Sequence, residues 1–279
     1  HSLIWNIIMN NLEKQAVIDI KKKLSPALDN ADLIEVKQLF SQIEVIQKTG
    51  GLPIVDLSGI SLAGLDLSSI SVRGLNLEGS DLTRTNFADS FLAGANFKDA
   101  VLLRTKLSGS MLGGANFTNA MMQLADLDYA DLTCADLSNA NMRDVGMCGA
   151  LFNEAIMVGC QIVDTKVDEA EFTKANLSGA DFTDADISDC NMKEVNLSGA
   201  NLTRAKLTGV DLRNANLSSS NLTGAEPWTS NMTGANLEKA NLTNTDFVSV
   251  KLKDANIKDI IITGSNLTVE KLVELQAQD

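Results

Sequence analysis

The chain has 279 residues, of which 23 are basic and 36 acidic, so its formal net charge is −13. No stretch approaches the roughly eighteen consecutive apolar residues of a membrane span, and we expect no membrane partner and no direct nucleic-acid binding. Aromatic residues make up only 4% of the chain. This composition fits a thin, repetitive body better than an enzyme.

Residues 1–51 are predicted to form a helical N-terminal cap or interaction module. Apolar residues recur at helical spacing in residues 3–24 and again in residues 31–48. Pro26 separates the two runs and Gly50 ends the second. Two roles stay open for this helical hairpin: a lid on the structure that follows, or a module for partner binding or dimerisation.

From Leu57 to Leu267 every fifth residue is large and apolar, over 43 positions in one frame, and Pro227 is the one exception. Neither an α-helix nor a flat strand has a period of five, so the chain must turn a corner every five residues and wind into a solenoid. Both the large residue and the one two places before it are expected to point inward, while the other three positions face water. The earlier of the two is usually small, as in Ala115, Ala120, Ala125, Ala130, Ala135 and Ala140.

The repeating unit reads Ala-Asn/Asp-Leu-Xaa-Xaa, most clearly at residues 135–139 and 175–179. This pattern resembles the pentapeptide-repeat family and extends over residues 52–267. The resemblance implies a mainly β fold, a right-handed quadrilateral β-helix with four units, or twenty residues, in each coil. In relatives of this family the C-terminal end often mediates dimerisation, so the resemblance also implies a possible homodimer through a terminal helical module.

Residues 268–279 follow the last repeat and are predicted to form a short C-terminal capping helix. The end of a β-helix exposes an apolar cross-section that another element must cover. We expect Val269, Leu272 and Val273 to face the last coil.

The sequence contains no constellation typical of catalysis. Nucleophilic catalysis needs a base beside the nucleophile, and the single histidine is His1. Cys134, Cys148, Cys160 and Cys190 show no C-x-x-C spacing, and the last two replace small inward residues on opposite sides of the tube, where they cannot be bridged. We therefore expect no enzyme activity, no catalytic residue, no cofactor and no metal, and the reduced thiols favour a cytoplasmic location.

Acidic residues concentrate in the middle of the repeat. Residues 120–200 hold 15 acidic and 4 basic side chains, which accounts for −11 of the total charge, over about four coils or ~20 Å. Positions twenty apart should stack in columns, and one outward column contains Asp144, Asp164 and Asp184. These carboxylates are expected to repel one another by roughly 1 kcal/mol per neighbouring pair, without relief within the column. The belt is either a solvated face or a docking strip for a basic partner or a weakly bound cation.

Apolar residues occupy several positions that the repeat normally gives to polar ones. A patch of four lies on the side of the acidic column and is a candidate partner-binding surface: Val101, Leu103, Met121 and Leu124. Three more lie on the opposite side, where they either stay exposed or pack on the N-terminal helices: Phe91, Met111 and Leu151.

Pro227 interrupts the inward frame in the segment Glu226-Pro227-Trp228. Proline cannot donate a ladder hydrogen bond, so the coil should bulge there and Trp228 should point outward. Trp228 then either covers the bulge or serves as an anchor for a partner.

These observations favour a non-enzymatic protein-binding scaffold that presents a rigid β-helical surface with a central acidic belt. One alternative is a DNA-mimicking regulator or protector of DNA gyrase or topoisomerase, as quinolone-resistance members of the resembled family are. The confinement of acidic residues to the middle of the rod argues against that alternative. A second alternative is a bacterial effector that recruits host proteins and is translocated by the source organism.

Overall fold

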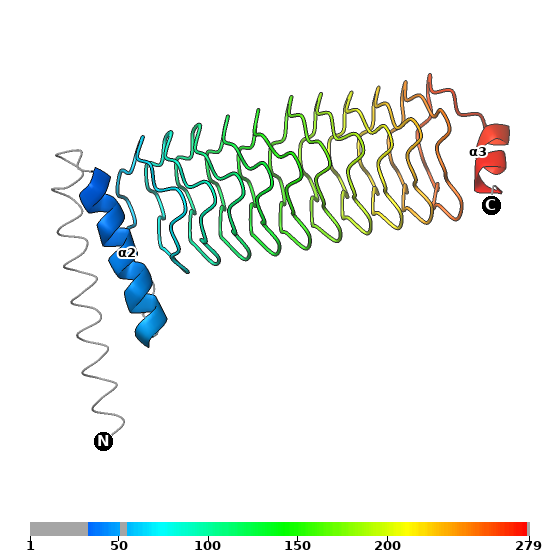
Figure 1. Cartoon of the computed structure of the whole chain (residues 1–279). Coiled ribbons are helices and arrows are strands. Elements are labelled where there is room, and N and C mark those ends of the chain that lie inside the picture. The colour runs from blue at the N-terminus through cyan, green and yellow to red at the C-terminus, as the bar shows by residue number, and fades with distance from the viewer. Residues whose placement is uncertain (1–32, 51–54, 278–279) are drawn as a thin grey trace.

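A computed structural model describes residues 33–50 and 55–277. Figure 1 shows a rod of stacked coils with one helix at each end, α2 (Leu33–Gly50) and α3 (Val269–Gln276). α2 agrees with the second helix predicted from the sequence. The other predicted helix, at residues 3–24, lies outside the described residues, and so does the proposed hairpin that would join the two.

Each coil of the rod contains twenty residues. Parallel β-bridges join residues twenty apart along the whole rod, from Asp56 and Asn76 to Asn241 and Ile261. The bridges form four columns, which we call the first, second, third and fourth faces. Their bridged residues begin at Asp56, Ser61, Asp66 and Ser71 respectively. The predicted coil of four five-residue units is therefore present, about 50 Å long at the usual spacing between strands.

The corners between faces are tight turns with one residue in the left-handed region. In the first coil the Leu65 N–H donates to the Leu62 carbonyl at 3.2 Å, and Gly64 has φ +74°, as a type II turn requires. The same positive φ recurs at every corner from Gly59 to Gly264, where 15 residues are glycine and 27 are not. Leu124 and Tyr129 are unusual there, because bulky side chains rarely adopt this conformation.

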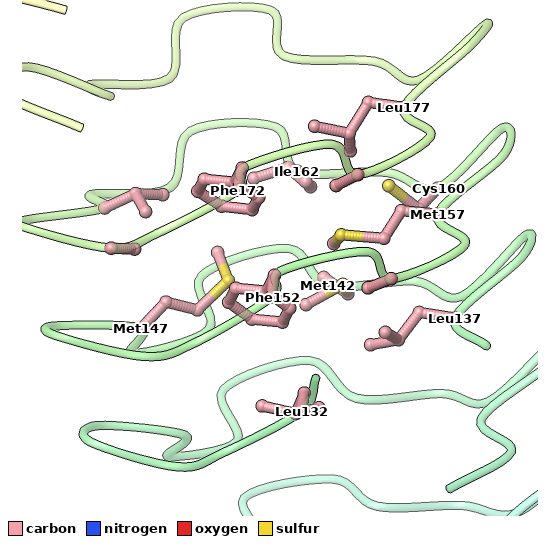
Figure 2. Packing of buried hydrophobic residues seen from close by; sticks show 14 of the residues in the cluster. Leu132, Leu137, Met142, Met147, Phe152, Met157, Cys160, Ile162, Phe172 and Leu177 are labelled. Carbon is pink, nitrogen blue, oxygen red and sulfur yellow. The ribbon is translucent and has the colours of Figure 1, made fainter. Parts of the chain in front are cut away.

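The interior of the rod is a ladder of the large residues that the frame predicted. Figure 2 shows these side chains from successive coils lying above one another inside the tube. Phe97 stacks on Phe117 at 4.7 Å between ring centroids, and Phe152 on Phe172 at 5.0 Å. Most inward Ser and Thr residues donate their hydroxyls to backbone carbonyls of the preceding coil, as Thr105 does to Leu82 at 2.7 Å. The packing arrangement of the core therefore repeats with each coil of twenty residues.

The expectation of a small second inward residue is wrong in the first coil. Ile60, Leu65 and Ile70 occupy that position, and Ile60 and Leu65 are only partly buried. No coil precedes them, so larger side chains fit there and extend the apolar surface towards α2. Three α2 residues are buried in the same core: Val36, Phe40 and Ile43.

α3 closes the opposite end of the rod. The Thr268 hydroxyl caps the helix by accepting from the Lys271 N–H at 3.1 Å. Leu272 and Leu275 are buried, but Val273 is 63% exposed, so the expectation that Val273 faces the last coil is wrong. One residue step turns a helix by about 100°, which carries Val273 away from the face that Leu272 and Leu275 share.

Candidate protein-docking surface

The column of three aspartates lies at the corners between the second and third faces. Asp164 pairs with Arg143 at 2.7 Å and Asp184 with Arg204 at 2.5 Å, and the Arg204 guanidinium lowers the pKa of Asp184. The expectation of unrelieved repulsion is therefore wrong for two of the three carboxylates, because arginines reach them from neighbouring positions. The Asp144 carboxylate makes no ion pair or hydrogen bond with the described residues.

The acidic belt is not spread evenly around the rod. Nine of the 15 carboxylates in residues 120–200 lie on the third face or at its two corners: Asp126, Asp128, Asp144, Asp164, Asp168, Glu169, Asp184, Asp186 and Asp189. Lys166 pairs with Asp168 at 2.8 Å, and Lys206 with Asp186 at 3.5 Å. One side of the rod therefore carries most of its negative potential.

An exposed tyrosine, which the sequence analysis did not select, stands on this acidic side. Tyr129 is 69% exposed and has φ 59°. The Cys148 Sγ in the next coil lies 3.8 Å from the Tyr129 hydroxyl oxygen, and the interaction with Cys148 raises the pKa of Tyr129. A Cβ on Gly149 would lie 2.8 Å from the tyrosine ring, so the ring rests against the glycine. The sequence feature that could have identified Tyr129 is an aromatic residue at a corner position of the repeat.

The predicted apolar patch is present on the second face. Leu103, Met121 and Leu124 are 36%, 49% and 46% exposed, while Val101 is half-buried. Val101 and Met121 are bridged in adjacent coils, so the patch is continuous. Two further exposed apolar residues on the first face, Ile156 and Val158, were not selected from the sequence.

The opposite apolar positions are partly engaged. Met111 is 50% exposed, while Phe91 and Leu151 are half-buried. The Arg73 guanidinium lies 4.7 Å from the Phe91 ring centre, and the Arg73 backbone exchanges two hydrogen bonds with the Gln47 side chain of α2. Among the described residues, Phe91 is connected to α2 through Arg73, while Met111 stays exposed; the first predicted N-terminal helix lies outside the described residues.

Pro227 disturbs the rod less than predicted. It stays buried, and the Ser230 N–H still donates to its carbonyl at 3.1 Å, so the turn is kept. What is lost is the β-bridge between Glu226 and Asp246. Trp228 points outward as expected, 38% exposed, and its Nε1–H donates to Asp246 at 3.2 Å. Trp228 thus lies over the interrupted ladder.

The described residues contain no cluster of three or more His, Cys, Asp or Glu side chains that could hold a metal. Cys160 and Cys190 are buried and unbridged, and burial raises the pKa of Cys190 to about 12 and that of Cys160 further. These two thiols are therefore not ionised at neutral pH. Neither described helix is long and apolar enough to cross a membrane.

Comparison with known sequences agrees with the geometry. The family described as pentapeptide repeats (8 copies) matches residues 60–167 in overlapping segments and again residues 230–268, and a related pentapeptide repeat region matches residues 165–230. The chain belongs to the pentapeptide-repeat family. A search among curated proteins finds no significant match.

Three solved pentapeptide-repeat structures illustrate the similarity. HetL from the cyanobacterium Nostoc, a protein involved in heterocyst differentiation regulation, is 25% identical over 80% of this chain and 92% of HetL, with a TM-score of 0.38. QnrB1, a plasmid-mediated fluoroquinolone resistance protein, is 18% identical over 74% of this chain and 97% of QnrB1, with a TM-score of 0.39. A protein of the Arabidopsis thaliana thylakoid lumen is 31% identical over 46% of this chain and 68% of its own, with a TM-score of 0.22. Scores this low do not carry a function from these proteins to this chain.

Proposed function

We propose that this protein is a non-enzymatic binding scaffold whose acidic third face docks a basic protein partner. The core needs only the inward residues, so outward departures from the repeat are free to serve another purpose. The observation that carries the proposal is Tyr129: a bulky, exposed side chain held at a corner that favours glycine or asparagine, among carboxylates. A rigid aromatic within a charged surface is the usual form of a binding anchor.

Two of the aspartates predicted as partner contacts are already paired with arginine, whereas Asp126 and Asp128 on the third face are half-buried and make no ion pair with the described residues. Asp126 and Asp128 lie on either side of the inward Leu127 on that face, and Tyr129 is at the corner that directly follows Asp128. The acidic residues of the third face extend over about four coils, which form a strip about 20 Å long. A strip of this length suits a short basic segment of a partner.

A photo-crosslinking side chain placed at Tyr129 in cells of the source organism tests this function. We expect a discrete crosslinked protein that is lost when Asp126 and Asp128 are changed to lysine. The same crosslinker at Thr243, on the second face near the other end of the rod, serves as the control. Equal labelling at both positions, or labelling unaffected by the charge reversal, would contradict a docking role for the third face.

DNA mimicry is the second candidate, because the carboxylates gather along one side of the rod. Against it, this strip covers only about four of the coils, whereas a duplex presents charge along its whole length and on both strands. We expect no inhibition of DNA gyrase supercoiling by the purified protein at micromolar concentration. Inhibition that disappears after Asp144, Asp164 and Asp184 are changed to asparagine would reverse the order of the two candidates.

The N-terminal module keeps two proposed roles. The burial of Val36, Phe40 and Ile43 in the common core supports the role of a lid. Dimerisation through a terminal helical module remains the alternative role.

A further inference from the structure

The charges along one corner of the rod change sign about a single apolar residue. The corner column between the second and third faces reads Arg84, Arg104, Leu124, Asp144 and Asp164 in five successive coils. Arg84 and Arg104 make no ion pair with the described residues, and neither does Asp144. Two unpaired cations thus stand on one side of Leu124, and carboxylates stand at the same spacing on the other.

We propose that the second face binds the second face of another copy of this chain, antiparallel, about a two-fold axis at Leu124. A two-fold axis perpendicular to both rods places each column opposite itself with the coil order reversed. Arg104 then faces Asp144 of the other copy, Arg84 faces its Asp164, and Leu124 faces its own counterpart. Because both rods have the same coil spacing, these pairs stay in register over five coils.

The other outward columns of the second face are compatible with the same axis. Met121 meets its own counterpart, which buries two side chains that are each 49% exposed in the single chain. Leu103 lies opposite the aliphatic stem of Arg143 of the other copy, and Arg143 keeps its pair with Asp164. Gln123 also lies opposite its own counterpart about this axis.

The pattern disfavours the neighbouring registers. An axis midway between the coils of Leu124 and Asp144 places Leu124 against Asp144, and an axis midway between the coils of Arg104 and Leu124 places Leu124 against Arg104. Moving the axis by one coil towards the C-terminus places Leu124 against Asp164 and leaves Arg104 against Asp184, which already pairs with Arg204. Moving it by one coil towards the N-terminus places Arg84 against Leu124. Each shift buries a charge against an apolar side chain, which is unfavourable. Leu124 has a left-handed backbone, with φ 60°, which a bulky residue rarely adopts. The proposed dimer gives a reason for leucine at this corner, because its side chain lies at the two-fold axis.

The contact should be weak and sensitive to salt. Seven coils overlap about the axis, a length of about 34 Å on a face roughly one strand wide, so the buried area lies at the low end for specific interfaces. The four exposed intermolecular ion pairs add specificity and are screened by salt. The dimer occupies Asp144 and Asp164 at one corner of the third face but leaves Asp126, Asp128 and Tyr129 open, so the inference is independent of the basic partner proposed above.

Sedimentation equilibrium at low salt, from micromolar to millimolar concentration, tests the proposal. The wild type should show a reversible monomer–dimer equilibrium that weakens as salt rises. Arg104→Glu alone and Asp144→Arg alone should each weaken dimerisation at least about tenfold, because each places like charges opposite one another twice. A mixture of the two variants should regain the wild-type affinity as a heterodimer, since both pairs then have opposite charges.

Lys251→Glu is the matched control, because it changes the net charge equally on the fourth face and should leave the affinity unchanged. Circular dichroism melting of every variant shows whether it is folded. A wild type that is monomeric at all concentrations overturns the proposal. So does a dimer that Arg104→Glu and Asp144→Arg leave intact, or a mixture that fails to associate although both proteins are folded.

A disulfide test locates the axis without depending on charge. In a Cys134→Ser, Cys148→Ser background, Leu124→Cys should form a covalent dimer on mild oxidation. Asn244→Cys occupies the same corner column six coils away, beyond the overlap, and should not. Equal crosslinking of both, or none at position 124 in a sample that sediments as a dimer, contradicts the two-fold axis.

Discussion

The first and third faces of the rod follow the same pattern of two inward residues in every five but differ in the regularity of their backbone hydrogen bonds. On the first face the bridges run without interruption from Asp56 to Asn256. On the third face they are missing between Gly146 and Lys166 and between Glu226 and Asp246. The exposed Tyr129 and Trp228 lie next to these two gaps. The two gaps in backbone pairing therefore lie on the third face, which together with its corners also carries Tyr129 and most carboxylates of the acidic belt.

Side chains reinforce the first face as well. An asparagine ladder joins successive coils, in which Asn216 donates to Asn196 at 3.1 Å and Asn236 donates to Asn216 at 3.3 Å. Each asparagine also accepts from the backbone two residues later, as Asn216 does from the Ser218 N–H at 3.2 Å. On the third face, residues 166–206 are joined by exposed ion pairs rather than by an asparagine ladder, and such pairs contribute little in water. We infer that the first face is the more rigid side of the rod.

The largest expected effect is common to all faces, because all share one core. Leu177 is fully buried on the first face, and Leu177→Asp should cost several kcal/mol by placing a charge in a space one side chain wide. We expect loss of a cooperative thermal transition, measured by circular dichroism. Leu177→Met conserves volume and should keep that transition. A native melting curve for Leu177→Asp would contradict the inward position of this frame.

Two single substitutions, one in the asparagine ladder of the first face and one in an ion pair of the third face, test the difference in rigidity between the two faces. Asn216→Ala should lower the free energy of unfolding by about 1–3 kcal/mol, because it leaves hydrogen-bonding groups of two neighbouring coils without partners. Lys206→Ala on the third face removes only its exposed pair with Asp186 and should cost about 0–1 kcal/mol. Urea denaturation of both variants measures the two values, and equal losses would remove the proposed difference in rigidity.

Amide hydrogen exchange sharpens the comparison within the third face. The Leu127 N–H donates to the Gly146 carbonyl at 2.7 Å, while the Met147 N–H, one coil later, has no acceptor among the described residues. We expect the Met147 amide to exchange at least about tenfold faster than that of Leu127, since its exchange requires less opening. Equal protection of the two amides would mean that the ladder is continuous in solution.

The smallest expected effect concerns a buried hydroxyl in the coil that precedes the second gap. The Ser230 Oγ is buried and has no hydrogen-bond partner among the described residues, so Ser230→Ala should be neutral or stabilising by up to about 1 kcal/mol. Ser110 is the matched control, because its hydroxyl donates to the Phe87 carbonyl at 2.7 Å, and Ser110→Ala should cost about 1 kcal/mol. Thermal melting compares the two, and a larger loss at Ser230 would indicate an unseen partner.

The sequence by itself determined the coil, because a period of five over 43 positions has one compact solution, and the inward residues are set by that period alone. It also placed Trp228 and the apolar patch outside, since each stands at a fixed step from an inward residue. The helix of residues 33–50 followed from its own apolar spacing.

Only the tertiary structure decided which outward side chains meet. Arg143 relieves Asp164, which lies 21 positions away, because a long side chain reaches diagonally across coils. The contact between Tyr129 and Cys148 likewise depends on the path of the chain at Gly149. The exposure of Val273 depended on how α3 meets the last coil. Inward packing is periodic and can be read along the chain, whereas surface pairing depends on rotamers and on the gaps in the ladder, which a five-residue period does not contain.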